Sequence, residues 1–474
     1  MPAQSQFQNS KLWQLAEKMP PVYLREADRW VASPFFNRKE QVSRLWDFIR
    51  QCLDKTSTER SHAAAFTFTF PQEHYDIHKL RLAMSDLYKL LLDFLAYKEW
   101  EKEKPAHALY QAQALRQMNL DKLSQQQLKQ AEKNNEKAPL RNADYYRVRY
   151  NIMAEQYVLN LRTQPADAHQ LQALSDTADL ALLSAKLQQA CLAIAHQSVY
   201  PAAYQLGFAQ QALAYIEEKG MTKVPVIGLY YYCYYMLKEP DQETYFQQFK
   251  SLLFEHGHSL GEREIRDLYL MGINFCIRQV NREAEGYFQE IIHFYRQGLK
   301  GGYLLENGQL SRFTYYNMVA AGLRTGDYEW VEFCIYEYRS KLERAYRESS
   351  FSFCLARLEY ARKHYDAALP LLQKANYRDP LLYLAAKTLL LKIYYETAEF
   401  DLLEANLDAM HNYIRRKRVI GYHRTNYLNI IRYVRKLMAV NPYDKKAIRK
   451  WREQLEKEEI LTERKWLLEL LNQT

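Results

Sequence analysis

The chain has 474 residues, a net charge of +9 and few of the residues that make turns. Glycine and proline number 14 each, too few for an all-β sandwich or barrel, which needs a turn roughly every 8–12 residues. A hydrophobic content of 48% excludes wholesale disorder, and 39 tyrosines make a large aromatic inventory. The composition therefore indicates a long helical protein.

Residues 1–165 are expected to form irregular helices that continue into the rest of the protein. Residues 76–100 show the clearest helical pattern, with apolar residues recurring every three or four positions between charged ones. Residues 66–70 alternate Phe and Thr as a strand does, but they stand alone before Pro71. We expect that segment to be extended or to be the end of a helix.

The most apolar run is VIGLYYYCYYML at residues 226–237, about twelve residues where a membrane span needs about twenty. We therefore expect a buried helix and no membrane span. The tyrosines of this run point all around a helix, so they fill the core or form a recognition surface, and we favour the core. They are Tyr230, Tyr231, Tyr232, Tyr234 and Tyr235.

The cysteines are scattered and mostly lie within apolar helical patterns, with no CxxC pair among them. They are Cys52, Cys191, Cys233, Cys276, Cys334 and Cys354. This pattern is typical of small, reduced core residues rather than of a disulfide framework or a zinc site. The polar residues 1–11 also lack the basic and apolar regions of a signal peptide, so we expect a cytoplasmic location.

A repeat runs through the second half of the chain. Tyr328, Tyr365 and Phe400 each follow a polar joint between two helical segments, and they are 37 and 35 residues apart. A weaker unit precedes them at residues 265–297. We expect helical repeats over residues 166–440, clearest over residues 312–415.

Residues 363–380 read KHYDAALPLLQKANYRDP, which resembles the second half of a tetratricopeptide repeat. The matching features are aromatic Tyr365, small Ala368 and Ala375, large Leu372 between them, and the stop at Asp379-Pro380. Small residues let antiparallel helices approach closely, and proline ends the pair. The flanking units depart from the pattern, with Val331 and Leu403 at the first alanine position. The resemblance implies an all-α, right-handed α-solenoid of antiparallel helix hairpins.

In tetratricopeptide folds the first helix of each pair lines the concave face. Phe353, Arg357 and Tyr360 share one face of such a helix, and the repeat spacing carries this stripe to both neighbouring units. The candidate groove residues are Tyr316, Arg357, Tyr360, Lys392 and Tyr395. They would suit an acidic or aromatic peptide, or they are ordinary half-exposed solenoid residues. The lysine and asparagine positions of the chaperone-type carboxylate site are not matched.

Motifs for catalysis are missing, since the chain has no P-loop, no G-x-S-x-G elbow and no H-E-x-x-H helix. His74 and His78 are four residues apart on a predicted helix, but no third metal ligand is identifiable. The histidines of His256-Gly257-His258 lie in a predicted loop, and we interpret both pairs as solvated. We predict no enzyme activity, no metal and no cofactor.

The net charge lies at the carboxyl end, because residues 411–474 hold 16 Lys and Arg against 7 Asp and Glu. The candidate basic patch is Arg415, Arg416, Lys417, Arg418, Arg432 and Arg435. Tyrosines lie between these cations, as in proteins that bind single-stranded nucleic acid through cations on its backbone and aromatic rings stacked on its bases. Cations are also favoured at the end of a helix by its dipole. Residues 441–474 are expected to form charged helices that cap the solenoid, as its exposed end requires.

These patterns support two functional hypotheses. The first is a non-catalytic scaffold or adaptor that binds a protein or peptide partner on the curved helical surface. The alternative is a nucleic-acid-associated protein that uses the basic region 411–452. Salt dependence separates them, because phosphate contacts weaken steeply as salt rises.

Overall fold

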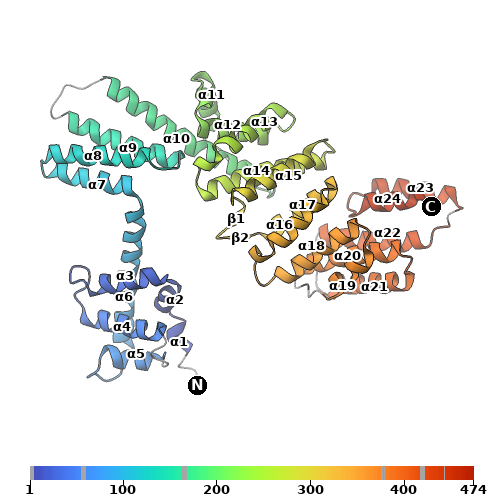
Figure 1. The fold of residues 1–474 in the computed structure, drawn as a ribbon, viewed down its shortest axis with the longest axis horizontal. Coiled ribbons are helices and arrows are strands. Elements are labelled where there is room, and N and C mark those ends of the chain that lie inside the picture. Colours follow the sequence, from blue (N-terminus) through green and yellow to red (C-terminus); the bar gives the residue numbers. More distant parts are fainter. Residues whose placement is uncertain are drawn as a thin grey trace. The chain divides into compact units, whose positions relative to one another are not determined.

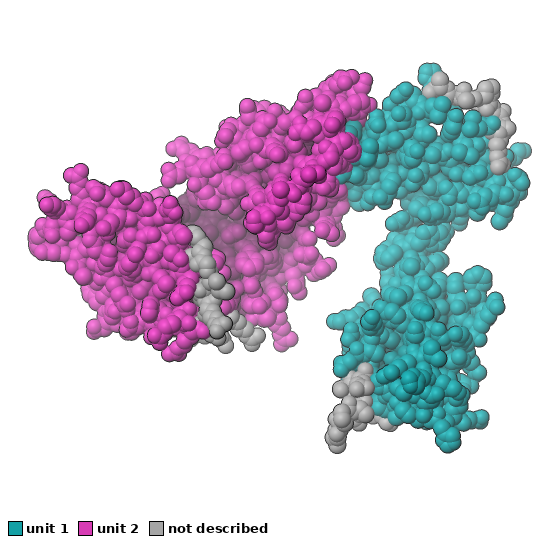
Figure 2. All heavy atoms as spheres, turned by 180° about the vertical axis from the view of Figure 1, so that it is seen from behind, with its two compact units in different colours: residues 1–185 teal, residues 186–474 magenta. Residues whose placement is uncertain are grey.

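The structure is a computed structural model that describes residues 5–54, 60–161, 168–374, 377, 379–416, 422–441 and 443–473. The chain divides into two compact units, residues 1–185 and 186–474, which have different colours in Figure 2. Both are built from helices that pack against their neighbours along the chain. The domain boundary expected at residue 165 lies outside the described residues.

Unit 1 contains two clusters of buried apolar side chains, one within residues 7–94 and one within residues 108–159. Its helices are α1 (Ser5–Gln8), α2 (Lys11–Lys18), α3 (Pro21–Ala32), α4 (Glu40–Leu53), α5 (His62–Thr69), α6 (Ile77–Lys102), α7 (Lys104–Gln117), α8 (Asp121–Glu136), α9 (Ala143–Asn160) and the first part of α10 (Ala168–Gln197) (Figure 1). Trp13 and Trp46 are fully buried in the first cluster. Beside the second, Glu155 of α9 forms an ion pair with Arg116 of α7.

The Phe-Thr alternation of residues 66–70 falls at the end of helix α5. The hydroxyl of Ser61 accepts a hydrogen bond from the Ala64 N–H at 3.1 Å and so caps the helix start. Phe66 and Phe70 are four residues apart, and their ring centroids lie 5.0 Å from each other. A spacing of four residues places both rings on one face of a helix. The segment is therefore the end of a helix and not an extended strand.

Unit 2 continues as helices packed in neighbouring pairs, α12 with α13, α14 with α15, α16 with α17, α18 with α19, and α20 with α21. The helices are α11 (Ala209–Glu218), α12 (Pro225–Lys238), α13 (Glu243–His256), α14 (Glu262–Asn281), α15 (Tyr287–Lys300), α16 (Arg312–Thr325), α17 (Tyr328–Glu337), α18 (Arg347–Ala361), α19 (Tyr365–Lys374), α20 (Pro380–Glu396), α21 (Phe400–Arg416), α22 (Tyr422–Met438), α23 (Lys445–Lys457) and α24 (Arg464–Gln473). Short 3-10 turns lie at η1 (Met221–Lys223), η2 (Gly257–Ser259) and η3 (Arg339–Lys341). The expectation of an all-α fold of paired helices is confirmed.

The three clearest repeats end their first helix with the same backbone turn. Gly326, Lys363 and Ala398 have φ angles of 73°, 65° and 57°, and each lies two residues before the aligned aromatic residue. The N–H of the next residue reaches back five positions, as His364 does to the Glu359 carbonyl at 2.9 Å. This is the Schellman arrangement, which satisfies the last carbonyls of a helix. The sequence repeat is thus also a repeat of backbone geometry.

The four glycines within residues 298–308 predict a loop or a kinked connection, but residues 305–310 form a small β-hairpin. Strands β1 (Leu305–Glu306) and β2 (Gln309–Leu310) pair antiparallel, with Leu305 opposite Leu310, and they are the only strands in the part of the chain that the structure describes. Asn307 and Gly308 at the tip have φ angles of 51° and 76°, as a two-residue type I′ turn requires.

Three of the five tyrosines of α12 lie in the core, as predicted, while Tyr232 and Tyr235 are half-buried. Tyr230, Tyr231 and Tyr234 are buried, and the Tyr230 hydroxyl donates a hydrogen bond to buried Glu264 at 2.7 Å. All six cysteines are buried, and none of them forms a disulfide bond. Burial raises the pKa of Cys334 and of Cys354 to about 12, so both thiols stay protonated at neutral pH.

Candidate functional site

The candidate groove residues lie on the first helices of three neighbouring pairs, α16, α18 and α20. Arg357, Tyr360 and Lys392 line a cavity of about 740 Å³. Its wall comes from α16, α18, α20 and α22 and from the segment that includes the start of α24. The other described lining residues are Ala320, Leu323, Arg324, Phe353, Ala361, Lys363, Ala385, Thr388, Leu389, Glu396, Tyr427, Thr462, Glu463, Arg464, Lys465, Trp466 and Glu469. We call this space the groove cavity.

Tyr316 and Tyr395 are not part of the wall but support it. The Tyr316 hydroxyl lies 2.7 Å from the Ser350 hydroxyl, which ties α16 to α18, and burial raises the pKa of Tyr316 to about 12. The Tyr395 ring packs edge-on against Trp466, with their ring centroids 5.7 Å apart. Both tyrosines are therefore half-buried packing residues beside the cavity.

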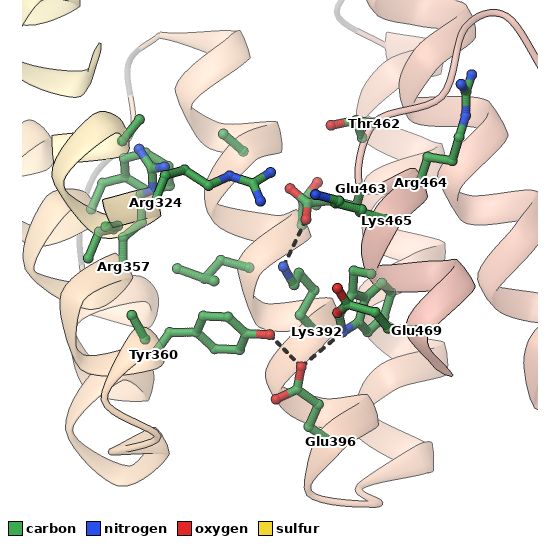
Figure 3. A pocket seen from close by; sticks show the side chains of 18 of the residues that line it. Arg324, Arg357, Tyr360, Lys392, Glu396, Thr462, Glu463, Arg464, Lys465 and Glu469 are labelled. Atoms are coloured by element: carbon green, nitrogen blue, oxygen red, sulfur yellow. Dashed lines mark hydrogen bonds and ion pairs between the residues drawn. The ribbon is translucent and has the colours of Figure 1, made fainter. Parts of the chain in front are cut away.

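Lys392 is the centre of a set of contacts with the carboxyl-terminal segment. Its ammonium group forms an ion pair with Glu463 at 2.8 Å, across 71 residues of sequence. It also lies 5.0 Å from the ring centroid of Tyr360 and 5.5 Å from that of Trp466. Figure 3 shows this ion pair bridging the cavity.

Glu396 collects four hydrogen bonds at the same wall, a role that the groove prediction missed. It accepts hydrogen bonds from the hydroxyls of Tyr360 and Tyr365, from the Trp466 indole at 2.9 Å and from the Lys363 ammonium at 3.1 Å. Burial acts to raise the pKa of Glu396, but these hydrogen bonds outweigh it and hold the pKa below its ordinary value of 4.5. Glu396 is therefore ionised at neutral pH and fastens α24 to α20.

Two arginines of the wall lack such partners. Among the described residues, no carboxylate lies within ion-pair distance of Arg324 or Arg357. Burial lowers the pKa of Arg357, whose guanidinium is also 5.8 Å from the Phe353 ring centroid. The wall formed by α16 and α18 thus carries two guanidinium groups without a direct ion pair to a described carboxylate, although the charge of Glu463 attracts Arg357 from a longer distance.

The predicted apolar side of the carboxyl-terminal helices is mostly buried. Leu455, Leu461, Trp466 and Leu467 are at most 9% exposed, while Trp451, Ile460 and Leu470 are half-buried. The segment between α23 and α24 is held by α22 through Glu458. That carboxylate accepts hydrogen bonds from Asn429 at 3.1 Å, Arg432 at 2.6 Å and Tyr433 at 3.0 Å.

The candidate basic patch is not one continuous surface of unpaired charge. Arg432 pairs with Glu458, and Arg435 pairs with Glu404 at 2.9 Å and with Asp408 at 2.5 Å. Arg415 and Arg416 are exposed in the last turn of α21. Lys417 and Arg418 lie outside the described residues.

The described residues hold no group of three or more histidine, cysteine or acidic side chains arranged for a metal ion, around His74 and His78 or elsewhere. Among the helices that the structure describes, only α10 has the length and apolar composition of a membrane span, and only marginally. No family model, curated protein or solved structure matches the chain.

Proposed function

We propose that this protein is a non-catalytic scaffold or adaptor that binds a protein or peptide partner in the groove cavity. In this proposal the pairs of unit 2 form a right-handed, tetratricopeptide-like solenoid, and their first helices provide the concave binding face. The protein acts in the cytoplasm and requires no cofactor. The step from this architecture to binding rests on analogy with helical repeats in general.

The observation that carries the proposal is the composition of the cavity wall. The described lining residues from the repeats come from α16, α18 and α20, together with Lys363 in the turn after α18, and none of these described residues belongs to the second helices α17, α19 and α21. This is the set of helices that would line the concave face of the proposed solenoid. The stripe has three positions on each first helix: Tyr316, Ala320 and Leu323 on α16, Phe353, Arg357 and Tyr360 on α18, and Thr388, Lys392 and Tyr395 on α20. All of these except Tyr316 and Tyr395 line the cavity.

Aromatic rings and cations share this surface, which favours a peptide ligand. Tyr360 and Lys392 present a ring and an ammonium group side by side, 5.0 Å apart. Such surfaces recognise acidic and aromatic side chains through charge and ring contacts. The volume of about 740 Å³ is that of a site for a few side chains.

The test is an affinity capture from native lysate with two variants that change the charge equally. Arg357→Glu/Lys392→Glu alters the groove, and Arg415→Glu/Arg416→Glu alters the exposed end of α21. We expect a discrete protein partner that survives nuclease treatment, remains with the second variant and is lost with the first. Circular dichroism melting of both variants checks that they are folded.

The opposite pattern refutes the proposal. Nucleic acid that is recovered with the native protein and the groove variant, but not with Arg415→Glu/Arg416→Glu, assigns the function to the basic region 411–452. In that case recovery also falls steeply as salt rises, because phosphate binding releases counterions.

A further inference from the structure

The carboxyl-terminal segment Thr462–Glu469 forms one wall of the groove cavity and covers part of the first-helix surface of its own chain. Five consecutive residues of this segment, from Thr462 to Trp466, line the cavity. Glu463 binds Lys392, and Trp466 binds Glu396 through its indole N–H and packs on Tyr395. The contacted residues belong to the stripe that predicts partner binding or lie beside it. The segment therefore holds the position that a partner would need.

The chemistry of the segment shows what this surface accepts. An acidic side chain at position 463 meets an ammonium group, and an aromatic side chain three residues later meets a carboxylate and a ring. Helix α24 begins directly after Glu463, because the Leu467 N–H donates a hydrogen bond to the Glu463 carbonyl at 3.0 Å. The surface thus accepts the start of a helix that carries an acid and, three positions on, an aromatic residue.

The two residues between them make the segment an imperfect ligand. Arg464 and Lys465 also line the cavity, where Arg324 and Arg357 have no carboxylate partner among the described residues. Figure 3 shows the two arginines on one side of the cavity and residues 462–465 on the other. Arg464 points away from the two arginines and donates hydrogen bonds to the carbonyls of Glu458 and Glu459, while Lys465 adds a further cation to the cavity. Neither residue therefore complements the charge of Arg324 and Arg357. A ligand with acidic residues at these two positions would complement the wall better.

We propose that the segment Thr462–Glu469 is a resident pseudo-ligand, and that the partner which displaces it is a peptide with an acidic residue three positions before an aromatic one and further acidic residues between them. This inference rests on the proposed function, because it names the class of partner that the groove binds. The resident segment prevents weaker ligands from binding, because a ligand must displace it. The positive charge of the wall favours an acidic peptide over other peptides.

The experiment uses the full chain and a labelled peptide that copies residues 458–473, EEILTERKWLLELLNQ, with binding followed by fluorescence anisotropy. The variant Glu463→Gln/Trp466→Ala removes the groove contacts of the resident segment. A ligand that competes with a segment bound nine-tenths of the time gains about tenfold in affinity when that segment is released. We therefore expect the variant to bind the peptide at least about tenfold more tightly than the native chain.

Two further arms test the site and the charge rule. We call Glu463→Gln/Trp466→Ala the opened variant. Adding Lys392→Met to it should abolish peptide binding. Adding Lys341→Met, which replaces an exposed lysine outside the cavity, should leave peptide binding unchanged. A peptide with Glu in place of Arg464 and Lys465 should bind about tenfold more tightly than the direct copy, as charge-assisted hydrogen bonds to the wall would provide. Glu463→Gln alone, at a side chain that is 35% exposed, repeats the test if Trp466→Ala prevents folding.

Equal binding by the native chain and the opened variants overturns the proposal, as does undetectable binding by both. If the peptide with Glu at positions 464 and 465 binds no more tightly than the direct copy of residues 458–473, the proposed preference for acidic residues there is wrong. A single-stranded oligonucleotide that binds as tightly as the acidic peptide overturns the assignment to peptides. If a lysate partner depends on Arg357 and Lys392 while these peptide tests fail, the scaffold function stands and the pseudo-ligand is refuted.

Discussion

Replacing Glu396 should loosen the carboxyl-terminal helix more than any other single change at the groove wall. The Glu396 side chain is only 14% exposed and accepts hydrogen bonds from two tyrosines, Trp466 and Lys363. Glu396→Ala leaves three donors half-buried without this acceptor, and each such loss costs about 1–3 kcal/mol. The Lys363 ion pair adds little, because that lysine is 67% exposed. Allowing for non-additive effects, we expect a loss of about 3–5 kcal/mol.

Urea unfolding and hydrogen–deuterium exchange measure this effect together, the first for the free energy and the second for its location. Exchange should rise in α24 and in the end of α20 and stay unchanged in α14. The matched control is Glu456→Ala, an exposed carboxylate on α23, which should stay within about 0.5 kcal/mol of the native chain. A Glu396→Ala variant that is as stable as this control would refute the assigned role of Glu396.

The same carboxylate predicts a dependence on pH. The pKa of Glu396 is lower in the folded state than its ordinary value of 4.5, so the folded state holds its proton less tightly than the unfolded chain. Its stabilisation is therefore complete above about pH 5 and is lost as the pH falls through the folded pKa. The stability difference between the native chain and Glu396→Gln should shrink over that range. A difference that grows toward low pH would contradict the depressed pKa.

Three further predictions concern single contacts. The ion pair of Lys392 and Glu463 is partly buried, so a double-mutant cycle with Lys392→Met and Glu463→Gln should give about 1–2 kcal/mol of coupling, and zero coupling would refute the contact. A Cβ at Gly272 would lie 2.4 Å from the Phe294 ring, so Gly272→Ala should cost about 1–3 kcal/mol in thermal unfolding, and an unchanged melting temperature would refute this packing. Glu155→Ala leaves the arginine of its buried ion pair uncompensated in unit 1 and should cost about 3–5 kcal/mol in urea unfolding, which an unaffected midpoint would contradict.

The helices and their pairing were predictable because each helix repeats its apolar residues every three or four positions. The turns between the helices were less predictable. Lys363 and Ala398 adopt a left-handed backbone conformation, which is usually predicted from a glycine in the sequence. Because these positions hold lysine and alanine, the sequence does not indicate the turns. Asn119 and Glu283 make the same turn after α7 and α14, so the repeated geometry extends beyond the residues where the sequence repeat is clear.

The β-hairpin was missed for a different reason. Asn307-Gly308 is a strong signal for a two-residue hairpin turn, but it follows three other glycines within eleven residues, and the run was interpreted as irregular. Only two residues on each side pair, so no alternating pattern precedes or follows the turn. Leu310 is 2% exposed, and its burial gives this short hairpin a place in the core.

Part of the groove cavity was predictable from helix geometry alone. Arg357, Tyr360 and Lys392 follow from the register of the repeat, and Glu396 lies four residues after Lys392 on the same helix face. Their interaction with the carboxyl-terminal segment was not predictable, because it joins residues about 70 positions apart. A cap was expected at the end of the solenoid, but its apolar pattern did not indicate which surface it would cover.

The side chains that pack the carboxyl-terminal segment against the repeats also cover part of the proposed binding surface, so our proposal links stability to binding. Trp466 is 7% exposed, and it would have to leave Glu396 and Tyr395 before a partner could bind there. The affinity of a partner for the intact chain is therefore reduced by the free energy that holds the segment in place. Mutations that weaken the segment should destabilise the protein and strengthen binding together. A plain structural cap predicts the first effect without the second, which is how the two roles can be separated.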